Sequence, residues 1–260
     1  MQTGRWCFAN RTFTPMIIYP LSEGQFTVDQ TKVFVPFDAG HDELNRRPAG
    51  SLLVEIQPFV IITSSDVILL DAGLGYRLGE ELQIHRQLKA VGVQPGQVTK
   101  VILSHLHKDH MGGIAYEDAA SGWQASFPHA TYYAQKTELE YALSMSSASY
   151  LPSLLHWLSS YERLVLLDGT TTIGSSIHCE LSGGHCPFHQ VIRISENNQL
   201  VFYGGDEAPQ LQQMKHRFVA KYDKDGKKAM QLRAQWWQQA ETEHWTFLFY
   251  HDLTNAVYHR

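Results

Sequence analysis

The chain is built from short apolar runs that are separated by polar turns. Runs rich in β-branched and aromatic residues are typical of strands, and they lie at Met16–Pro20, Thr31–Phe37, Ser51–Ile56, Phe59–Thr63, Val67–Leu70, Ala130–Ala134 and Leu164–Leu167. Apolar residues recur at helical spacing from Leu82 to Val91, which predicts an amphipathic helix over Gly79–Val91. Further helices are predicted over Thr137–Met145 and Pro152–Tyr161. This alternation predicts an α/β protein whose helices cover sheet faces.

Four more apolar runs are each followed by a histidine or an aspartate. They lie at Val101–Leu103, Ser176–Leu181, Leu200–Tyr203 and Thr246–Tyr250, and the residues that follow them are His105, His185, Asp206 and His251. Shared placement at strand ends would gather these side chains on one rim of a sheet sandwich. Imidazoles and carboxylates are common metal ligands. The pattern therefore predicts a metal site at that rim.

The segment from Ser104 to Gly113 contains the highest density of potential metal ligands in the chain. Its ligand-type residues are His105, His107, Asp109 and His110. Residues two apart in an extended chain point to the same side, so His105 and His107 can hold one ion together. Asp109 and His110 follow where the chain must turn, and they can face a second ion. Gly112 and Gly113 permit the tight backbone path that such a loop needs.

This segment resembles the His-x-His-x-Asp-His signature of the metallo-β-lactamase superfamily. Residues Ser182–Gln190 are similar to a second motif of that family, commonly Thr-Pro-Gly-His-Thr-Pro-Gly-His. The match is partial, because Gly183 stands in place of the first proline and Phe188 in place of the second glycine. The resemblance covers roughly Met16 to His251 and implies a four-layer αββα sandwich.

The resemblance also implies how the chain is divided. Residues 1–260 are expected to form a single domain, in which residues 1–15 carry little pattern and form an N-terminal arm. Residues 207–245 read as a polar, helical insert before the last ligand strand. A similar insert occurs in hydrolases that resemble N-acyl-homoserine lactonases and methyl parathion hydrolase.

The ligand set follows from the same resemblance. One ion is assigned to His105, His107 and His185, the other to Asp109, His110 and His251, with Asp206 bridging between them. Asp71 is either part of a structural turn or, as in the family, a residue beneath the metal loop that orients a ligand by hydrogen bonding. His189 is expected to be a buried, hydrogen-bonded histidine. Cys186 is either a reactive thiol or a packed small residue.

Composition limits the partners. The formal net charge is −5 and there is no long basic run, so nucleic acid is a poor partner. No apolar run approaches the roughly 20 residues that span a bilayer, and the N-terminus lacks the features of a signal peptide. Three cysteines cannot all pair within one chain, which favours reduced thiols and a cytoplasmic location. The oligomeric state is open, with a homodimer as one option.

The implied chemistry is metal-dependent hydrolysis of a small molecule. Two divalent cations about 3.5–4 Å apart can share a water and lower its pKa from about 15.7 towards about 7. The bridging hydroxide then attacks an ester, lactone or phosphoester, and Asp109 can accept a proton as the intermediate collapses. All-His/Asp ligation suits zinc, and iron and manganese use the same ligand types.

Other activities occur on this fold, and the sequence can be compared with the features that each of them requires. Glyoxalase II hydrolyses a thioester but carries a further C-terminal helical domain, whereas nine residues follow His251 here. Iron-dependent redox members typically have Glu where His107 stands. Lactonases often place a tyrosine soon after the bridging acid, and here Glu207-Ala-Pro209 stands instead. Candidate pocket residues, named only for their closeness in sequence to the ligand loops, are Phe188, Tyr116 and Trp123.

Overall fold

Two six-stranded sheets form the centre of the computed structural model, which describes residues 15–260. The first sheet has the order β1 (Ile17–Pro20), β5 (Phe59–Ile62), β6 (Val67–Leu70), β9 (Lys100–Ile102), β12 (Thr131–Gln135) and β13 (Leu164–Leu167). The second has the order β14 (Thr171–Ile173), β15 (Ile177–Leu181), β16 (Gln190–Glu196), β17 (Gln199–Tyr203), β18 (Trp245–Leu248) and β19 (Val257–His259). Both sheets are mixed, since β6, β9, β12 and β13 run parallel, as do β17 and β18.

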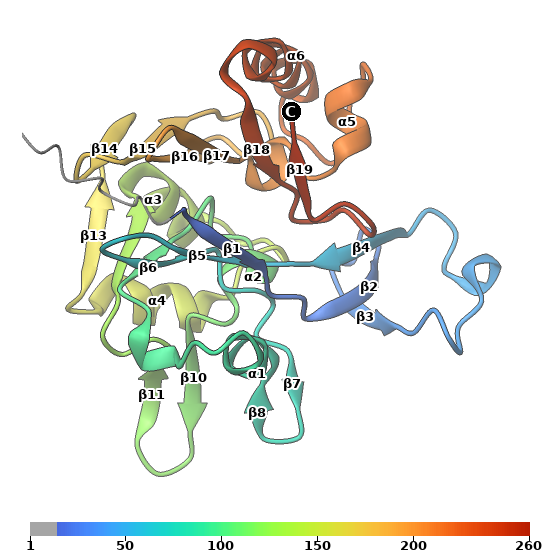
Figure 1. Cartoon of the computed structure of the whole chain (residues 1–260). Helices are drawn as coiled ribbons and strands as arrows, with labels where there is room; N and C mark the ends of the chain where they lie inside the picture. Colours follow the sequence, from blue (N-terminus) through green and yellow to red (C-terminus); the bar gives the residue numbers. More distant parts are fainter. Residues whose placement is uncertain (1–14) are drawn as a thin grey trace, which may run out of the picture.

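Helices cover the outer face of each sheet, so the predicted αββα sandwich is confirmed (Figure 1). The helices on the first sheet are α1 (Gln83–Ala90), α3 (Lys136–Ser144) and α4 (Pro152–Ser160), and those on the second are α5 (Leu211–Lys215) and α6 (Gly226–Glu243). A short helix, α2 (Lys108–Met111), follows the end of β9. Single 3-10 turns lie at Leu44–Arg46, Pro95–Gln97 and Gly205–Glu207.

Alternation along the central strands explains the layers. In β6, Ile68 and Leu70 face the second sheet, while Leu69 faces the helices. In β9, Ile102 faces the second sheet and Val101 faces the helices. A parallel strand covered on both faces is apolar at nearly every position, because neither face meets water.

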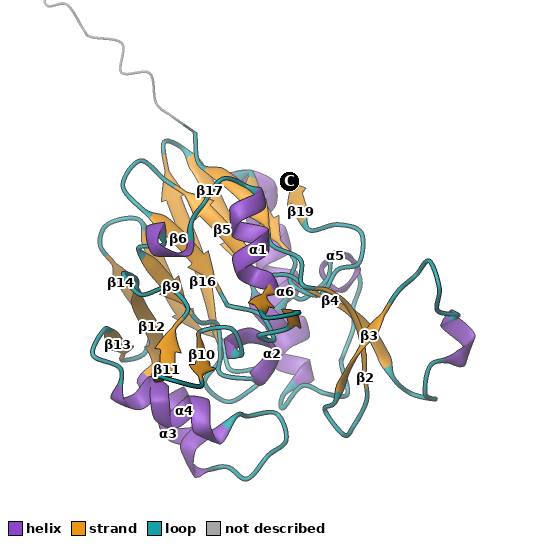
Figure 2. Cartoon of the chain, turned by 90° about the horizontal axis from the view of Figure 1, so that it is seen from below, coloured by secondary structure: helices purple, strands orange, loops and turns teal. Residues whose placement is uncertain are grey.

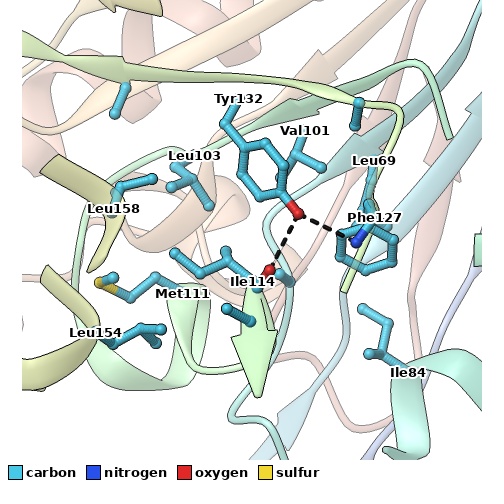
Figure 3. Packing of buried hydrophobic residues seen from close by; sticks show 14 of the residues in the cluster. Leu69, Ile84, Val101, Leu103, Met111, Ile114, Phe127, Tyr132, Leu154 and Leu158 are labelled. Atoms are coloured by element: carbon cyan, nitrogen blue, oxygen red, sulfur yellow. Dashed lines mark hydrogen bonds between the residues drawn. The ribbon is translucent and has the colours of Figure 1, made fainter. Parts of the chain in front are cut away.

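Tyr132 is buried in the hydrophobic layer between the first sheet and its helices (Figure 3). Its ring is packed among aliphatic side chains, and its hydroxyl donates to the Ile114 carbonyl at 3.0 Å. The same hydroxyl accepts from the Phe127 amide at 3.2 Å. The buried hydroxyl of Tyr132 thus both donates and accepts a hydrogen bond, as burial of a polar group requires.

Three smaller sheets accompany this body, and the one formed by β2, β3 and β4 projects from it (Figure 2). A three-stranded sheet joins β2 (Gly24–Val28), β3 (Phe34–Phe37) and β4 (Leu52–Ile56), and two hairpins pair β7 (Arg77–Leu78) with β8 (Glu81–Leu82) and β10 (Ala115–Asp118) with β11 (Gly122–Ala125). Strand β2 was not predicted from the sequence. The helix predicted over Gly79–Val91 begins only at Gln83, because the β7–β8 hairpin occupies the preceding residues.

Three expectations concern the rest of the chain. The proposed N-terminal arm lies almost wholly outside the described residues. Cys179 and Cys186 are buried free thiols, and burial raises the pKa of Cys179 to about 12. Between residues 15 and 260, the structure contains no helix that combines the length and apolar character needed to cross a membrane.

A buried carboxyl group holds the turn that follows β6. Glu23 is 3% exposed, and its Oε2 accepts from the Leu74 amide at 2.6 Å. Gly73 has φ +79°, and a Cβ there would lie 2.5 Å from the Glu23 carboxyl carbon, so only glycine fits. Burial raises the pKa of Glu23 to about 8, although the amides of Leu74, Tyr76 and Gly75 act in the opposite direction.

This carboxyl group predicts a pH-dependent stability. Because the folded-state pKa lies above the ordinary value of 4.5, the folded protein binds the proton more tightly than the unfolded chain. The stabilisation is complete below pH 4.5 and is lost as the pH rises towards about 8. Glu23→Gln keeps the group neutral, so the free energy of unfolding of the variant relative to wild type should rise by about 2–4 kcal/mol across this window. Urea denaturation of metal-stripped protein measures it, and parallel pH profiles would contradict the assignment.

Candidate metal centre

The seven predicted ligand residues come together at the rim formed by the ends of β9, β17 and β18 and the loop after β15. Their donor atoms form two groups, and within each group all lie within 4.8 Å of one another. The first group contains His105, His107, His185 and Asp206, and the second contains Asp109, His110 and His251. The sequence-based assignment has the same two sets of residues but places Asp206 between them.

Asp206 lies between the two groups and faces both. Its Oδ2 is 3.2 Å from His185 Nε2. Its Oδ1 is 3.1 Å from both His110 Nε2 and His251 Nε2. Each carboxylate oxygen is therefore directed at a different group, which is the arrangement that lets one carboxylate bridge two cations.

The imidazole nitrogens of the first group face one another at short range. His107 Nδ1 lies 2.9 Å from His105 Nε2 and 3.2 Å from His185 Nε2. A neutral imidazole has only one N–H, and His185 directs its other nitrogen at the carboxylate of Asp223, 3.0 Å away. Two ligand nitrogens on a tetrahedral zinc lie about 3.3 Å apart, given Zn–N bonds of about 2.0–2.1 Å. The three lone pairs thus converge as they do around a cation.

The second group shows the same fit. His110 Nε2 and Asp206 Oδ1 are buried and neither makes a hydrogen bond. A buried polar atom without a partner is costly. A cation placed between these atoms would satisfy both, so the residues present fit a pair of divalent ions.

The outward nitrogens of four rings are held by protein groups. His105 Nδ1 lies 3.1 Å from Ser104 Oγ, and His110 Nδ1 lies 2.7 Å from Asp71 Oδ2. His251 Nδ1 lies 2.7 Å from the Glu55 carbonyl oxygen, and His185 pairs with Asp223 as described. Such contacts fix the ring orientation and the tautomer of a metal-binding histidine.

Burial and neighbouring carboxylates shift the pKa values of the histidines in the centre. Burial holds the pKa of His105 and of His107 well below the usual range, which leaves both neutral, as metal binding requires. Burial opposes a charged His110, but Asp206, Asp109 and Asp71 outweigh it and raise its pKa well above the usual value.

The bridging carboxylate is held in its ionised form. Burial opposes ionisation of Asp206, yet the neighbouring His251, His110 and His185 hold its pKa well below the usual range. A carboxylate in this position can therefore face both groups as an anion.

The backbone around the second group is packed too closely for side chains. A Cβ on Gly112 would lie 2.2 Å from the Leu74 carbonyl oxygen, and one on Gly113 would lie 2.1 Å from that of Ala72. The turn after β6 thereby supports the loop that carries Asp109 and His110. This close approach is the physical reason for the two glycines noted in the sequence.

His189 is fully buried and belongs to neither group. Its Nδ1 lies 3.1 Å from Ser182 Oγ, and its Nε2 accepts from the Asp206 amide at 3.2 Å. Cys186 is buried as well, with its thiol 3.6 Å from a carboxylate oxygen of Glu138. Burial raises the pKa of the Cys186 thiol well above its usual value, so the packed alternative fits better than a reactive thiol.

The three candidate pocket residues divide between two places. Phe188 packs against Tyr141, with ring centroids 5.7 Å apart. Tyr116 and Trp123 line a cavity of about 440 Å³ to which none of the seven grouped residues contributes. That cavity is lined by residues of β10, β11 and the start of α4, and by Gly112.

Several residues that shape the centre were not singled out from the sequence. Asp223 lies in a charged stretch that resembles solvated surface, yet it contacts His185. Glu207 accepts from the His185 amide at 3.0 Å. Tyr250 stacks on His110 at 4.1 Å between centroids and donates to the Asp109 carbonyl at 2.5 Å. Only Tyr250 carried a signal, since it immediately precedes His251 at a strand end.

Comparison with known families agrees with this geometry. The family model of the metallo-beta-lactamase superfamily matches residues 55–209, which is more than half of the chain. The chain therefore belongs to the metallo-beta-lactamase superfamily.

Among curated relatives, N-acyl homoserine lactonases match parts of the chain. The N-acyl homoserine lactonase AttM of Agrobacterium fabrum is 41% identical over 58 residues, which are 22% of this chain and 18% of that protein. The N-acyl homoserine lactonase of Bacillus thuringiensis is 28% identical over 118 residues, which are 45% of this chain and 41% of that protein. The matched segments thus cover less than half the length of these relatives.

Solved structures match over nearly the whole chain. A probable metal-dependent hydrolase from Staphylococcus aureus has a TM-score of 0.74 at 21% identity and covers 94% of this chain and 92% of its own. AidC, a dizinc quorum-quenching lactonase solved with the product N-hexanoyl-L-homoserine, has a TM-score of 0.72 at 19% identity, covering 94% and 90%. At these identities the likeness establishes the fold.

The contact between Asp223 and His185 predicts a role in metal affinity. Asp223→Ala removes the acceptor of the outward nitrogen, so metal binding at the first group should weaken by about 10–100-fold. Chelator competition with metal analysis measures this. Asp118→Ala, on the exposed β10–β11 hairpin, is the matched control and should bind metal as wild type does. Equal affinities in both variants would exclude the role of Asp223.

The position of His189 predicts the opposite behaviour. His189→Gln disturbs two buried hydrogen bonds and should cost about 1–3 kcal/mol of stability. Because His189 belongs to neither group, both metal equivalents should be retained. Thermal unfolding and metal analysis of the same preparation test this, and loss of one equivalent would make His189 a ligand.

Proposed function

We propose that this protein is a dinuclear metal-dependent hydrolase that opens a lactone or a related small ester. The observation that carries the proposal is Asp206, whose two oxygens face two separate ligand groups. The first ion is assigned to His105, His107 and His185, and the second to Asp109, His110 and His251. When bound, a pair of divalent cations would lower the pKa of a water and polarise a carbonyl oxygen.

The chain's own residues have distinct tasks in this proposal. Asp206 would hold both ions, and the rings held by Asp71, Asp223 and the Glu55 carbonyl keep their lone pairs directed inward. Asp109 Oδ2 lies 3.5 Å from His251 Nε2 and 3.7 Å from His110 Nε2. Its carboxylate is placed to accept a proton while the tetrahedral intermediate collapses. No serine or cysteine nucleophile is required.

Two comparisons support a lactone and zinc over the other options. The curated relatives with partial matches are N-acyl homoserine lactonases, and AidC is described as dizinc. His107 stands where redox members of the fold typically carry Glu, which favours hydrolysis over iron chemistry. Metal analysis of protein purified without added metal separates the two classes. A panel of lactones, aryl esters, thioesters and phosphotriesters then tests the substrate class.

The bridging carboxylate gives the sharpest test of the proposed centre. Asp206→Ala should remove at least one metal equivalent and lower kcat/KM by more than the roughly 10–100-fold typical of a residue behind a ligand. Metal content and hydrolysis are measured on the same preparation, with Asp118→Ala as the control for loss of an acid. An Asp206→Ala protein with full metal content and full activity would rule out the bridge.

A further inference from the structure

Glu138 is a buried acid that belongs to neither ligand group. It lies near the start of α3, which covers the first sheet, and its side chain is only 1% exposed. Glu140, two residues further along the same helix, is exposed, as a surface acid usually is. An acidic side chain is almost never fully buried unless its oxygens are paired. The partners of Glu138 therefore indicate why it lies inside.

Three hydrogen-bond donors from separate segments meet at its carboxylate. Oε1 accepts from the Leu106 amide and from the Tyr150 hydroxyl, each at 3.3 Å. Oε2 accepts from the Cys186 thiol at 3.6 Å. Leu106 separates the two histidines of the metal loop, and Cys186 directly follows His185. One carboxylate thus joins both chain segments that carry the histidines of the first group.

His107 is held differently from the other ligand histidines. Those four rings each direct an outward nitrogen at a protein group, as described above, whereas no residue between 15 and 260 forms a hydrogen bond with His107 Nε2. Instead, its ring contacts the Tyr150 ring edge to face, with centroids 5.1 Å apart. The Tyr150 hydroxyl is in turn fixed by Glu138. Glu138 therefore reaches His107 both through the Leu106 backbone and through the Tyr150 ring.

The separation of two ligand nitrogens depends on this arrangement. His107 Nδ1 and His185 Nε2 lie 3.2 Å apart, although they come from different segments. A shift of either segment would separate them, and a site holds a ligand well only when its supporting contacts fix it in advance. Burial raises the pKa of Glu138 to about 7, although hydrogen bonds from Leu106, Cys186 and Tyr150 act in the opposite direction. In alkaline buffer the group is therefore ionised.

We propose that Glu138 is a positioning residue for the first ion. Its carboxylate, together with Tyr150, holds His107 and His185 at the separation that one divalent cation requires, and neither residue is itself a ligand. This inference rests on the proposed dinuclear function and specifies which ion each supporting carboxylate serves. The affinity for the first ion depends on Glu138, whereas the affinity for the second does not.

Zinc binding tests this role without any substrate. Chelator competition in alkaline buffer gives the two dissociation constants of metal-stripped protein. Glu138→Gln keeps the size of the side chain and removes its charge, so one constant should rise by about tenfold, the lower end of the range for residues behind a ligand. The other constant should stay at the wild-type value. Glu140→Gln removes the same charge from the exposed face of α3 and is the matched control, with both constants unchanged.

A second substitution shows which ion is affected. Asp223 contacts the ring of His185, so Asp223→Ala marks the constant that belongs to the first ion. Glu138→Gln should raise this same constant. A change confined to the other constant, or an equal change in both, would overturn the assignment to the first ion.

Tyr150→Phe separates positioning from a general loss of stability. It keeps the ring against His107 and removes only the hydroxyl that donates to Glu138. The same constant should rise, by less than in Glu138→Gln, and the double variant should lose less than the product of the two single effects. A merely structural Glu138 would lower the unfolding temperature of metal-stripped protein and leave both zinc constants at wild-type values, which would overturn the proposal. If Glu138→Gln does not fold, Tyr150→Phe alone decides.

The outcomes also separate this inference from the proposed function. Two zinc ions bound, one of them weakened in Glu138→Gln, without hydrolysis of any ester or lactone by the wild type, would overturn the proposed hydrolase and leave the positioning role standing. Hydrolysis by the wild type, with unchanged zinc constants in Glu138→Gln and Tyr150→Phe, would overturn the role of Glu138 and leave the function standing.

Discussion

Four hydrogen-bond donors converge on the buried carboxylate of Asp71, and this contact organises the centre. The Ser104 amide and hydroxyl donate at 2.7 and 2.6 Å, His110 Nδ1 lies 2.7 Å away, and the Tyr203 hydroxyl donates at 2.5 Å. Asp71 follows β6 of the first sheet, whereas Tyr203 ends β17 of the second. The carboxylate therefore joins both sheets to the loop that carries His105. Its backbone φ of +55° is rare for a residue with a side chain, and the converging donors hold it there.

Much of the centre could be predicted because its ligands stand at strand ends. Strands that pack in one sandwich bring their ends to a common rim, so residues far apart in sequence, such as His105 and His251, meet there. Asp223 and Glu207 could not be found in this way. Both lie in polar segments whose composition is that of solvated surface, and only the packing of α6 and its preceding loop against the His185 segment places them inside.

The strands also differ in how well their sequence pattern alone predicts them. Strands β6 and β9 are continuous apolar runs, because both of their faces are covered, and they were found without difficulty. Strand β16 (Gln190–Glu196) was missed, since it follows His189 without a turn residue and mixes charged with apolar positions. The hairpins β7–β8 and β10–β11 are too short to show a period, and they are defined by pairing with each other.

The segments around the ligand groups come from two different parts of the chain. The family match at residues 55–209 contains six of the seven grouped residues, and His251 lies beyond it. Tyr222 and Asp223 also follow the match, with the Tyr222 ring 5.9 Å from that of His185. The matched region thus contains most of the candidate ligands, and the segment that follows it supplies His251 and the contacts beside His185. Because function on a shared fold depends on the particular residues at the site, contacts outside the family match, such as that of Asp223 with His185, matter to the proposed centre as the matched motif does.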